Sequence, residues 1–305
     1  MYTFPHPNDL EPLIEIIRPL RISNILENVA QVRSATQTIA VKGLPRSTYY
    51  TGPGPLPQHI IAEEIAKQPC GPCTWIYYGM SYGPPHIRKY KLDIIHAEFS
   101  KIEGARKIDP ATIPRDNYFW SRDRIASGQP DIEELLWTNW VPNGAHIAFS
   151  PVSPIRGKDA RALLDLARKR HEEHGIDLFP AFCVGLREMH LIVEIVFDKH
   201  SPSSRKAALA CMRAMVDDAA KLGYGEYRTA LPLMDQVART YDWNDGALLK
   251  LQERVKDALD PRGILAPGKS GVWPARNRGR GREMLGGGEE RVEGEGVARS
   301  GESRL

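Results

Sequence analysis

The sequence has 305 residues, and its 41 Lys and Arg residues nearly balance 38 Asp and Glu residues, for a formal net charge of +3. This balance argues against nucleic acid as the main partner, and the 42% hydrophobic fraction excludes wholesale disorder. No apolar run approaches the roughly 18 residues of a membrane helix, no signal peptide is visible, and four cysteines are too few for a disulfide scaffold. We therefore expect a soluble intracellular protein of one large or two ordinary domains, with a small molecule as its partner.

The first 140 residues alternate between helical and extended patterns. Apolar residues three and four positions apart predict a helix from about residue 10, which Pro19 should end or bend. Amphipathic patterns predict further helices at 57–68 and 85–102, and the β-formers of 74–78 predict a strand between them.

A more regular pattern follows from residue 144 to about 224. It predicts the order strand, helix, strand, strand, helix, at 146–150, 157–174, 177–184, 189–197 and 204–222. This order is most of a split βαβ unit, so we expect an α+β fold in which helices flank an antiparallel sheet, as in ferredoxin-like domains. Two short helices are predicted within 230–258.

Two motifs that attract attention carry little weight. Cys70 and Cys73 form a C-x-x-C of thioredoxin type, but the helix precedes the motif instead of following it, so a turn with two thiols is the better interpretation. Cys183 and Cys211 supply no second C-x-x-C for zinc, and we predict no metal site. No G-x-G-x-x-G or P-loop is present to hold a nucleotide phosphate.

Tyr227 and Arg228 place a phenol and a fixed positive charge side by side, which suits an oxyanion. Taken alone, a surface arginine beside a half-buried tyrosine is the commoner explanation. The segment 260–269, D-P-R-G-I-L-A-P-G-K, taken alone predicts a helix end and a turn.

Together these segments resemble the C-terminal region of the FAD-linked oxidases of the vanillyl-alcohol oxidase and 4-cresol dehydrogenase family. The segment 260–269 matches the family signature D-P-x-G-I-x-x-P-G-K. The vanillyl-alcohol oxidase branch is matched by the N-G-A-H of 143–146, the V-G-L-R-E-M-H of 184–190 and the G-E-Y-R-T of 225–229. The resemblance spans residues 2–274.

The resemblance implies roles for individual residues. His146 matches the histidine that carries FAD through an 8α bond, and we weigh this against an ordinary packed imidazole. Tyr227 and Arg228 match the pair that binds the substrate as phenolate, and Arg228 also suits the charge that develops on the reduced flavin. Lys269, in the signature, is expected at the cofactor. The expected substrate pocket contains His190, Ile192 and Ala148, and Ala148 replaces an aromatic residue of the closest branch.

The implied reaction is hydride transfer from the benzylic carbon of a para-substituted phenol to FAD, with molecular oxygen or another electron acceptor reoxidising the flavin. The phenolate form of the ring pushes electron density toward the departing hydride. The exact phenol is open, because Leu191 stands where the closest branch has a second histidine.

The resemblance also predicts the domain organisation. We expect a substrate-covering cap at 1–223, the C-terminal part of a split FAD-binding domain at 224–274, and a disordered tail at 275–305, with the N-terminal part of the FAD-binding domain absent. An alternative function is then a non-catalytic remnant that does not hold FAD tightly. The 224–274 segment should expose Leu231, Leu233 and Trp273, which the absent part would cover.

The last three residues, Ser303-Arg304-Leu305, resemble the Ser-Lys-Leu peroxisomal address. Peroxisome and cytoplasm are therefore both open as locations. A homo-oligomer is possible.

Overall fold

A computed structural model of the chain describes residues 1–279. Residues 280–305, which include most of the expected disordered tail and the final tripeptide, lie outside the described residues. The chain divides into two compact units, 1–229 and 230–305, each of which is described by itself. No helix in the described part of the chain is long and apolar enough to cross a membrane.

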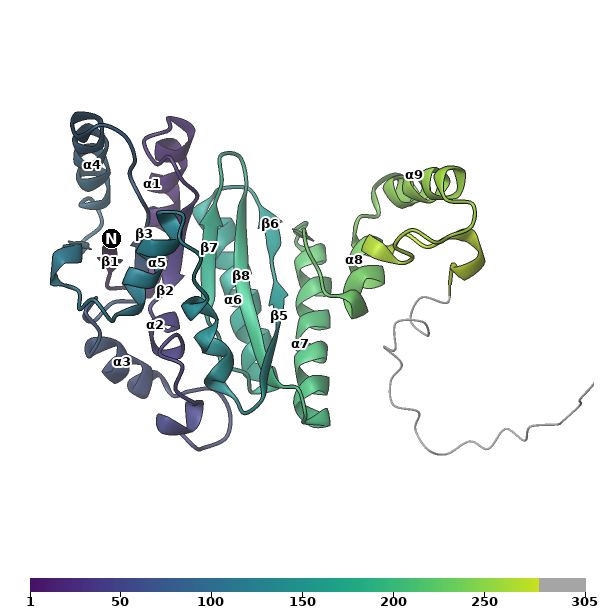
Figure 1. The fold of residues 1–305 in the computed structure, drawn as a ribbon, viewed down its shortest axis with the longest axis horizontal. Coiled ribbons are helices and arrows are strands. Elements are labelled where there is room, and N and C mark those ends of the chain that lie inside the picture. Colours follow the sequence, from purple (N-terminus) through teal and green to yellow (C-terminus); the bar gives the residue numbers. More distant parts are fainter. Residues whose placement is uncertain (280–305) are drawn as a thin grey trace, which may run out of the picture. The chain divides into compact units, whose positions relative to one another are not determined.

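The first unit is built on one antiparallel sheet of nine strands, whose order in the sheet differs from their order in the sequence (Figure 1). The strand order is β4-β1-β3-β2-β7-β8-β6-β9, and β5 also pairs with β8. The strands are β1 (Tyr2–Phe4), β2 (Ala30–Ser34), β3 (Trp75–Tyr78), β4 (Arg106–Lys107), β5 (Gly144–Phe149), β6 (Pro151–Ser153), β7 (Pro180–Val184), β8 (Met189–Asp198) and β9 (Gly225–Glu226).

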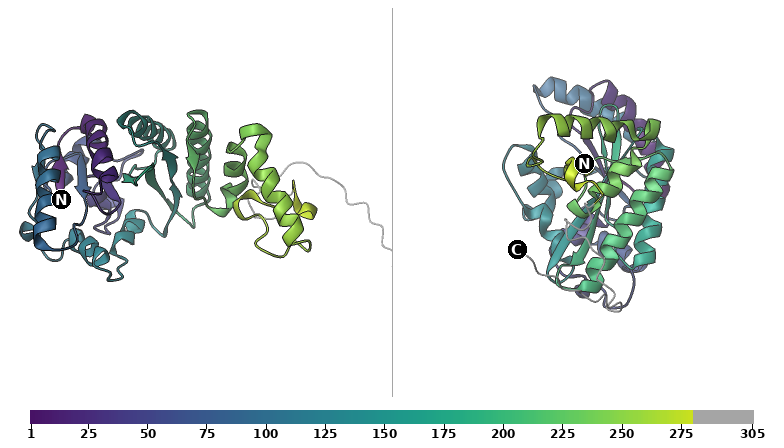
Figure 2. Two further views of the ribbon diagram at one scale, coloured as in Figure 1. Left: turned by 90° about the horizontal axis from the view of Figure 1, so that it is seen from above. Right: turned by 90° about the vertical axis from the view of Figure 1, so that its right-hand side faces the viewer.

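Three helices lie side by side on one face of this sheet: α1 (Leu10–Ile22), α6 (Gly157–His174) and α7 (Pro202–Lys221) (Figures 1 and 2). Their apolar stripes meet the strand residues that alternate inward, so that Leu163 of α6 and Leu191 of β8 are both fully buried. Gly175 ends α6 in the left-handed conformation (φ 66°), which glycine adopts without steric cost.

The opposite face carries shorter elements over part of the sheet. These are α2 (Gln37–Ala40), α3 (Gln58–Ala66), α5 (Tyr118–Ala126) and the 3₁₀ segment η4 (Glu133–Trp140). Trp140 and Ile39 are buried members of the hydrophobic cluster that these elements form with the sheet. Helix α4 (Pro85–Phe99) buries Phe99 against the rings of Tyr2 and Phe4.

The expected α+β fold with an antiparallel sheet and flanking helices is confirmed. Pro19 does not end the helix, because α1 continues through Pro19 to Ile22. Leu20 and Arg21 in this last turn are buried, and Arg21 donates to the carbonyl oxygens of Leu26 and Asn28, which holds the turn in place. Within the first 140 residues the sequence predicted only the strand at 74–78, which is β3. Strands β1, β2 and β4 of the same stretch were not predicted.

The second unit contains η5 (Leu231–Leu233), α8 (Met234–Thr240), α9 (Trp243–Leu259), η6 (Lys269–Gly271) and η7 (Ala275–Asn277). Leu231 is exposed as expected, but Leu233 and Trp273 are buried, so the expectation of exposure is wrong for these two. Trp273 packs within its own unit, where its indole Nε1 donates to Asp235 Oδ1 at 2.7 Å. The ordered chain extends past Pro274, since Arg278 pairs with Glu253 and Asp257 of α9.

Candidate functional site

Four of the residues expected at the site lie on two neighbouring strands of the first unit. His146 and Ala148 belong to β5, and His190 and Ile192 belong to β8. In the antiparallel register Ala148 is opposite Glu194 and His146 is opposite Val196. Because strand side chains alternate, these residues share the face that points away from α1, α6 and α7. Strand alternation therefore gathers His146, Ala148, His190 and Ile192 on one surface.

Tyr227 and Arg228 reach the same surface from the end of β9, which pairs with β6. The ring of Tyr227 packs against the imidazole of His190 with centroids 5.1 Å apart, and Cζ of Arg228 lies 5.6 Å from the Tyr227 ring centroid. Arg228 Nε donates to Ser150 Oγ at 3.4 Å, and the backbone N–H of Tyr227 donates to the carbonyl oxygen of Ser150. Ser150 thus fixes both members of the pair.

Arg228 dominates the charge of this surface. Burial lowers the pKa of His146, and the positive charge of Arg228 lowers it further. Burial also lowers the pKa of His190, where the carboxylate of Glu188 acts in the opposite direction and Arg228 acts in the same one. Both imidazoles are therefore neutral at neutral pH, and a neutral imidazole keeps a lone pair on one ring nitrogen.

Two acidic residues that the sequence did not single out lie on this surface. Glu226 is buried, and its Oε2 accepts the backbone N–H of Ser150 at 2.7 Å; its carboxyl also accepts the N–H of Arg228. Burial raises the pKa of Glu226 to about 7. Burial likewise raises the pKa of Glu194, against which Arg228 acts. Their positions could be read from the sequence, since Glu226 precedes Tyr227 and Glu194 continues the alternation of His190 and Ile192, but their burial could not.

Glu194 and Trp137 flank the expected flavin-bearing histidine. The Nε2 atom of His146 lies 3.6 Å from Glu194 Oε2, and the indole of Trp137 meets the imidazole edge to face with centroids 4.7 Å apart. The His146 side chain is nevertheless 41% exposed. The imidazole is therefore confined on two sides and accessible from outside.

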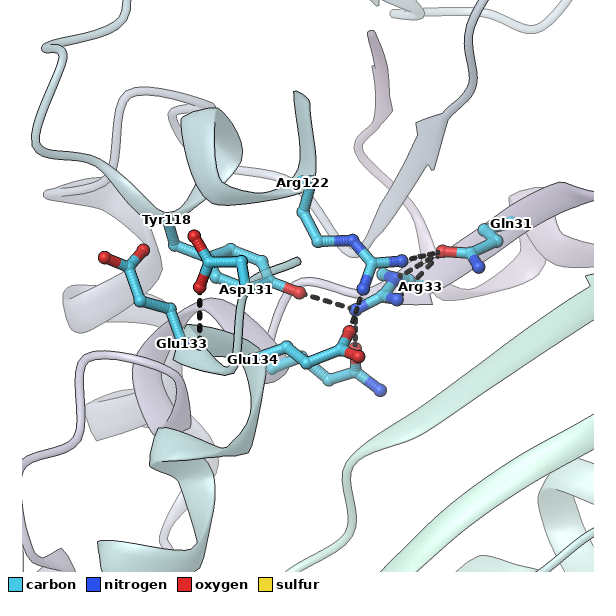
Figure 3. A network of polar contacts seen from close by, with 8 residues as sticks. Gln31, Arg33, Tyr118, Arg122, Asp131, Glu133 and Glu134 are labelled. Carbon is cyan, nitrogen blue, oxygen red and sulfur yellow. Dashed lines mark hydrogen bonds and ion pairs between the residues drawn. The ribbon is translucent and has the colours of Figure 1, made fainter. Parts of the chain in front are cut away.

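A polar network borders the site on the same face of the sheet (Figure 3). Arg33 and Arg122 both donate to Oε1 of Gln31, Arg33 also donates to the hydroxyl of Tyr118, and Arg122 pairs with Glu134. Burial lowers the pKa of Arg122, and the neighbouring charge of Arg33 lowers it further. The network therefore brings two guanidinium groups close to the carboxylate of Glu134.

Cross-strand register links this network to the histidines. Gln31 is opposite Cys183, and Cys183 is opposite His190, so the three lie in one row across β2, β7 and β8. Burial raises the pKa of the Cys183 thiol, and the charges of Arg33, Arg122 and Arg228 all oppose that rise. Three guanidinium groups therefore act on the middle of this surface.

The structure brings together six of the seven predicted site residues: His146, Ala148, His190, Ile192, Tyr227 and Arg228. Lys269 belongs to the second unit, where it is exposed at the start of η6. Their functional roles stay predictions. Among the described residues no cluster of metal-ligating side chains occurs, and all four cysteines are free thiols.

The 260–269 segment has a structural reason for its composition. Asp260 accepts the N–H groups of Ile264 and Leu265 and pairs with Lys256 at 2.7 Å, and hydrogen bonds to Lys256 and these amides lower its pKa to about 2. Gly268 has φ 81°, and a Cβ there would lie 2.4 Å from the indole of Trp273. These contacts require the aspartate and the glycine at their positions in the signature.

Comparison with known proteins gives a consistent result. A sequence profile of the family "FAD linked oxidases, C-terminal domain" matches residues 145–270. The flavoprotein subunit of 4-cresol dehydrogenase [hydroxylating] from Pseudomonas putida is 29% identical over 269 residues, which are 88% of this chain and 51% of that protein. The 1'-carboxy-chondrochloren decarboxylase of Chondromyces crocatus is 31% identical over 140 residues, 42% of this chain and 24% of that protein.

Solved structures show the same fold. The 4-ethylphenol oxidase from Gulosibacter chungangensis, in an isoeugenol complex, superposes with a TM-score of 0.84 at 34% identity, covering 91% of this chain and 54% of that one. Substrate-bound p-cresol methylhydroxylase gives a TM-score of 0.83 at 29% identity, covering 89% and 52%. The chain thus spans about half the length of these relatives. The resemblance noted in the sequence is confirmed for their C-terminal part.

Proposed function

This chain matches the C-terminal part of the vanillyl-alcohol oxidase and 4-cresol dehydrogenase family, and we propose that it provides the substrate-binding part of a flavin-dependent phenol oxidoreductase. Its reaction is hydride transfer from the benzylic carbon of a para-substituted phenol to FAD. The observation that carries the proposal is the convergence of Tyr227, Arg228, His190 and His146 on one face of the sheet.

The pair Tyr227 and Arg228 binds the phenolic oxygen in this proposal. The guanidinium is a permanent positive charge, so it stabilises the phenolate over the phenol, and the Tyr227 hydroxyl donates to the same oxygen. Ser150 and Glu226 hold the pair in place through the contacts described above. A bound phenolate donates electron density toward its para substituent, where the hydride departs.

The residues present fit FAD. His146 combines a neutral, partly exposed imidazole with a confined ring, which suits a covalent bond to the flavin, and Lys269 is a second candidate for contact with the cofactor. FAD, when bound, supplies the hydride acceptor, and molecular oxygen or another electron acceptor removes the electrons. Arg228 favours negative charge on whichever group lies against it.

The relatives support the substrate class. The names of three of them refer to two simple phenols, 4-cresol (also called p-cresol) and 4-ethylphenol. Ala148, small and beside His146 on β5, gives room for a larger para substituent than an aromatic residue would at that position. We therefore expect a para-alkyl phenol or its benzylic alcohol as substrate.

A second candidate function is a non-catalytic cap that folds without holding FAD tightly. It is favoured by the first unit, which is compact and has a buried apolar core of its own. The test is to express the 305-residue chain with FAD, precipitate it with acid, and look for yellow colour that stays with the protein and for oxygen uptake with 4-cresol. A coloured product that loses its colour in His146→Ala supports the enzyme; a colourless product without oxygen uptake supports the cap.

If turnover is observed, Arg228→Gln should reduce it by roughly a hundredfold or more, the usual cost of one oxyanion donor. Tyr227→Phe should also reduce it, since one donor to the phenolic oxygen is lost. The peroxisomal location is a separate proposal that rests on Ser303-Arg304-Leu305 alone. A reporter carrying the last dozen residues that stays diffuse in the cytosol favours the cytoplasm.

A further inference from the structure

The turn that joins α3 to β3 carries both cysteines of the C-x-x-C motif (Figure 1). Helix α3 ends at Ala66, before Cys70, and β3 begins at Trp75, after Cys73. The motif therefore does not lie at the start of a helix, which excludes the thioredoxin arrangement, in which the helix dipole activates the first thiol. Activation of these thiols has to come from another group.

The two thiols of this turn are in contact, because the side chains of Cys70 and Cys73 share a hydrogen bond. Gly71 bends the chain between them with φ 63°, a left-handed conformation that glycine adopts without steric cost. Its N–H donates to the carbonyl oxygen of Gln68 at 2.8 Å, which holds the turn. Two thiols that share a hydrogen bond need only small side-chain rotations to form a disulfide.

Arg106 approaches this turn from the edge strand β4. Its Nη2 donates to the carbonyl oxygens of Cys70 at 3.0 Å and of Pro72 at 3.1 Å. A Cβ at Gly71 would lie 3.0 Å from the same Nη2, so the glycine lets the guanidinium come close to the backbone. Arg106 thus places a permanent positive charge beside the two thiols, where no helix dipole acts on them.

The two thiols differ in their access to solvent. Cys70 is fully buried in the hydrophobic cluster that contains Ile39 and Trp140, whereas Cys73 packs against this cluster and is only half-buried. An oxidant from solvent therefore meets Cys73 first, and Cys70 is the neighbour that can react with the oxidised sulfur. An accessible cysteine beside a second, resolving cysteine is the usual arrangement of a redox-sensitive site.

We propose that Cys70 and Cys73 form a redox site: a peroxide oxidises them to an intramolecular disulfide, and Arg106 favours the thiolate that starts the reaction. This site goes beyond the proposed function and does not depend on it, because any peroxide serves as the oxidant. An oxidase that reduces molecular oxygen releases hydrogen peroxide, so the proposed reaction is one source of this oxidant.

The electrostatics favour one thiolate within the pair. The hydrogen bond from Cys73 lowers the pKa of Cys70, burial opposes this shift, and the charge of Arg106 lowers the pKa further. The same hydrogen bond and burial raise the pKa of Cys73, and Arg106 opposes them. The pair therefore loses one proton more readily than an isolated buried thiol and holds the second between its sulfurs. This second proton can move to Cys70, which leaves the thiolate on the accessible Cys73.

The reaction consumes one hydrogen peroxide for each pair. The Cys73 thiolate attacks one peroxide oxygen, so that the O–O bond breaks, Cys73 becomes a sulfenic acid, and hydroxide leaves and takes up the proton that the pair had released. The sulfur of Cys70 then attacks the sulfur of Cys73, the S–S bond forms, and the sulfenic hydroxyl leaves as water with the Cys70 proton. The two thiols together lose two electrons, which reduce the peroxide to two molecules of water.

The test is mass spectrometry of the 305-residue chain after treatment with hydrogen peroxide and alkylation of the remaining thiols. Trypsin should release residues 68–88 as one peptide that contains both cysteines. We expect this peptide to be two hydrogen atoms lighter, to resist alkylation, and to recover both thiols with dithiothreitol. A peptide that stays alkylated at both cysteines, or that is oxidised to a sulfinic acid without a disulfide, would overturn the proposal.

The remaining cysteines of the chain are internal controls. Cys183 in β7 and Cys211 in α7 are buried on elements other than the turn, so they should stay reduced under the same treatment. In Cys70→Ala, which lacks the resolving thiol, Cys73 should go on to the sulfinic acid instead of a disulfide. Because the peroxide is added, these results stand whether or not the chain binds a flavin.

The role of Arg106 is tested by the rate of disulfide formation at neutral pH. Arg106→Gln should slow it several-fold, because the charge that favours the thiolate is lost, and Arg106→Lys should recover most of the rate. Lys107→Gln, at the next residue of β4, is the matched control and should react like the wild type. Equal rates in Arg106→Gln and Lys107→Gln would contradict the role assigned to Arg106.

Discussion

The backbone N–H of Ser150 donates to Oε2 of Glu226 at 2.7 Å, so a carboxyl in β9 fixes the loop between β5 and β6. The same carboxyl accepts the N–H of Arg228, and Arg228 in turn donates to the hydroxyl of Ser150. Ser150 thus forms one closed set of hydrogen bonds with Glu226 and Arg228, which lie 76 and 78 residues later in the sequence and flank Tyr227. The protonation of Glu226 should therefore affect both stability and the positions of Tyr227 and Arg228.

Glu226 should make the first unit less stable as the pH rises. Burial raises its pKa from 4.5 to about 7, so the folded state binds more protons than the unfolded state between these values. Its favourable contribution is fully present below pH 4.5 and is lost as the pH rises through 7. Glutamine does not titrate, so the variant lacks this loss. The free energy of unfolding of Glu226→Gln minus that of the wild type should therefore rise by up to about 3 kcal/mol from pH 5 to pH 8. Urea unfolding at both values measures this, with the exposed Glu172→Gln as control.

His171 should have the opposite pH dependence. It is buried in α6, its Nδ1 lies 2.8 Å from the carbonyl oxygen of Ala167, and burial lowers its pKa from 6.5 to about 4. Its neutral form is stable above pH 6.5, and stability falls by up to about 3 kcal/mol as the pH falls to 4. His171→Gln should lower stability at pH 7 but flatten this acid dependence. The same slope in His171→Gln and in the exposed control His86→Gln would contradict the prediction.

Arg228→Gln should raise the pKa of both His146 and His190, because the arginine charge lowers each of them. Titration of the histidine signals by NMR in the 305-residue chain measures both shifts without substrate or cofactor. Arg168→Gln, on the exposed surface of α6, should leave both values unchanged. If only one histidine responds, Arg228 does not face the two together.

Gly268→Ala should destabilise the second unit more than Gly246→Ala does. Both glycines have positive φ, 81° and 69°, so each substitution carries a backbone cost of about 1 kcal/mol. A Cβ at Gly268 would in addition meet the Trp273 indole at 2.4 Å, whereas nothing lies within 4 Å at Gly246. We expect about 1–3 kcal/mol more for Gly268→Ala. Limited proteolysis and Trp273 fluorescence report it, and equal losses would argue against the clash.

Regular, amphipathic segments could be predicted from the sequence. The helix expected at 157–174 has the bounds of α6, because its leucine spacing and its terminal Gly175 both mark the element. Strand β2 could not be found in this way, since Gln31 and Arg33 interrupt its apolar residues. Their side chains are instead held by Tyr118 and Arg122, which are some ninety residues away in the sequence and become neighbours only on folding.

The site was predictable where it carries sequence motifs and not where it depends on burial. His146, His190, Tyr227 and Arg228 came from motifs, and the structure places them together. Glu194 and Glu226 were missed because a carboxylate is ordinarily an exposed residue, and nothing local shows that the sheet buries these two. Trp273 was expected at the surface for the converse reason, since its partner Asp235 lies 38 residues earlier.

The two faces of strand β8 carry different kinds of side chain. One face consists of Met189, Leu191, Val193 and Ile195, which are fully buried. The other presents His190, Ile192 and Glu194, so stability and chemistry depend on different side chains of the same ten-residue strand. Exchanges at 190, 192 and 194 therefore change the outer surface of the sheet while the apolar set keeps the strand pairing in register.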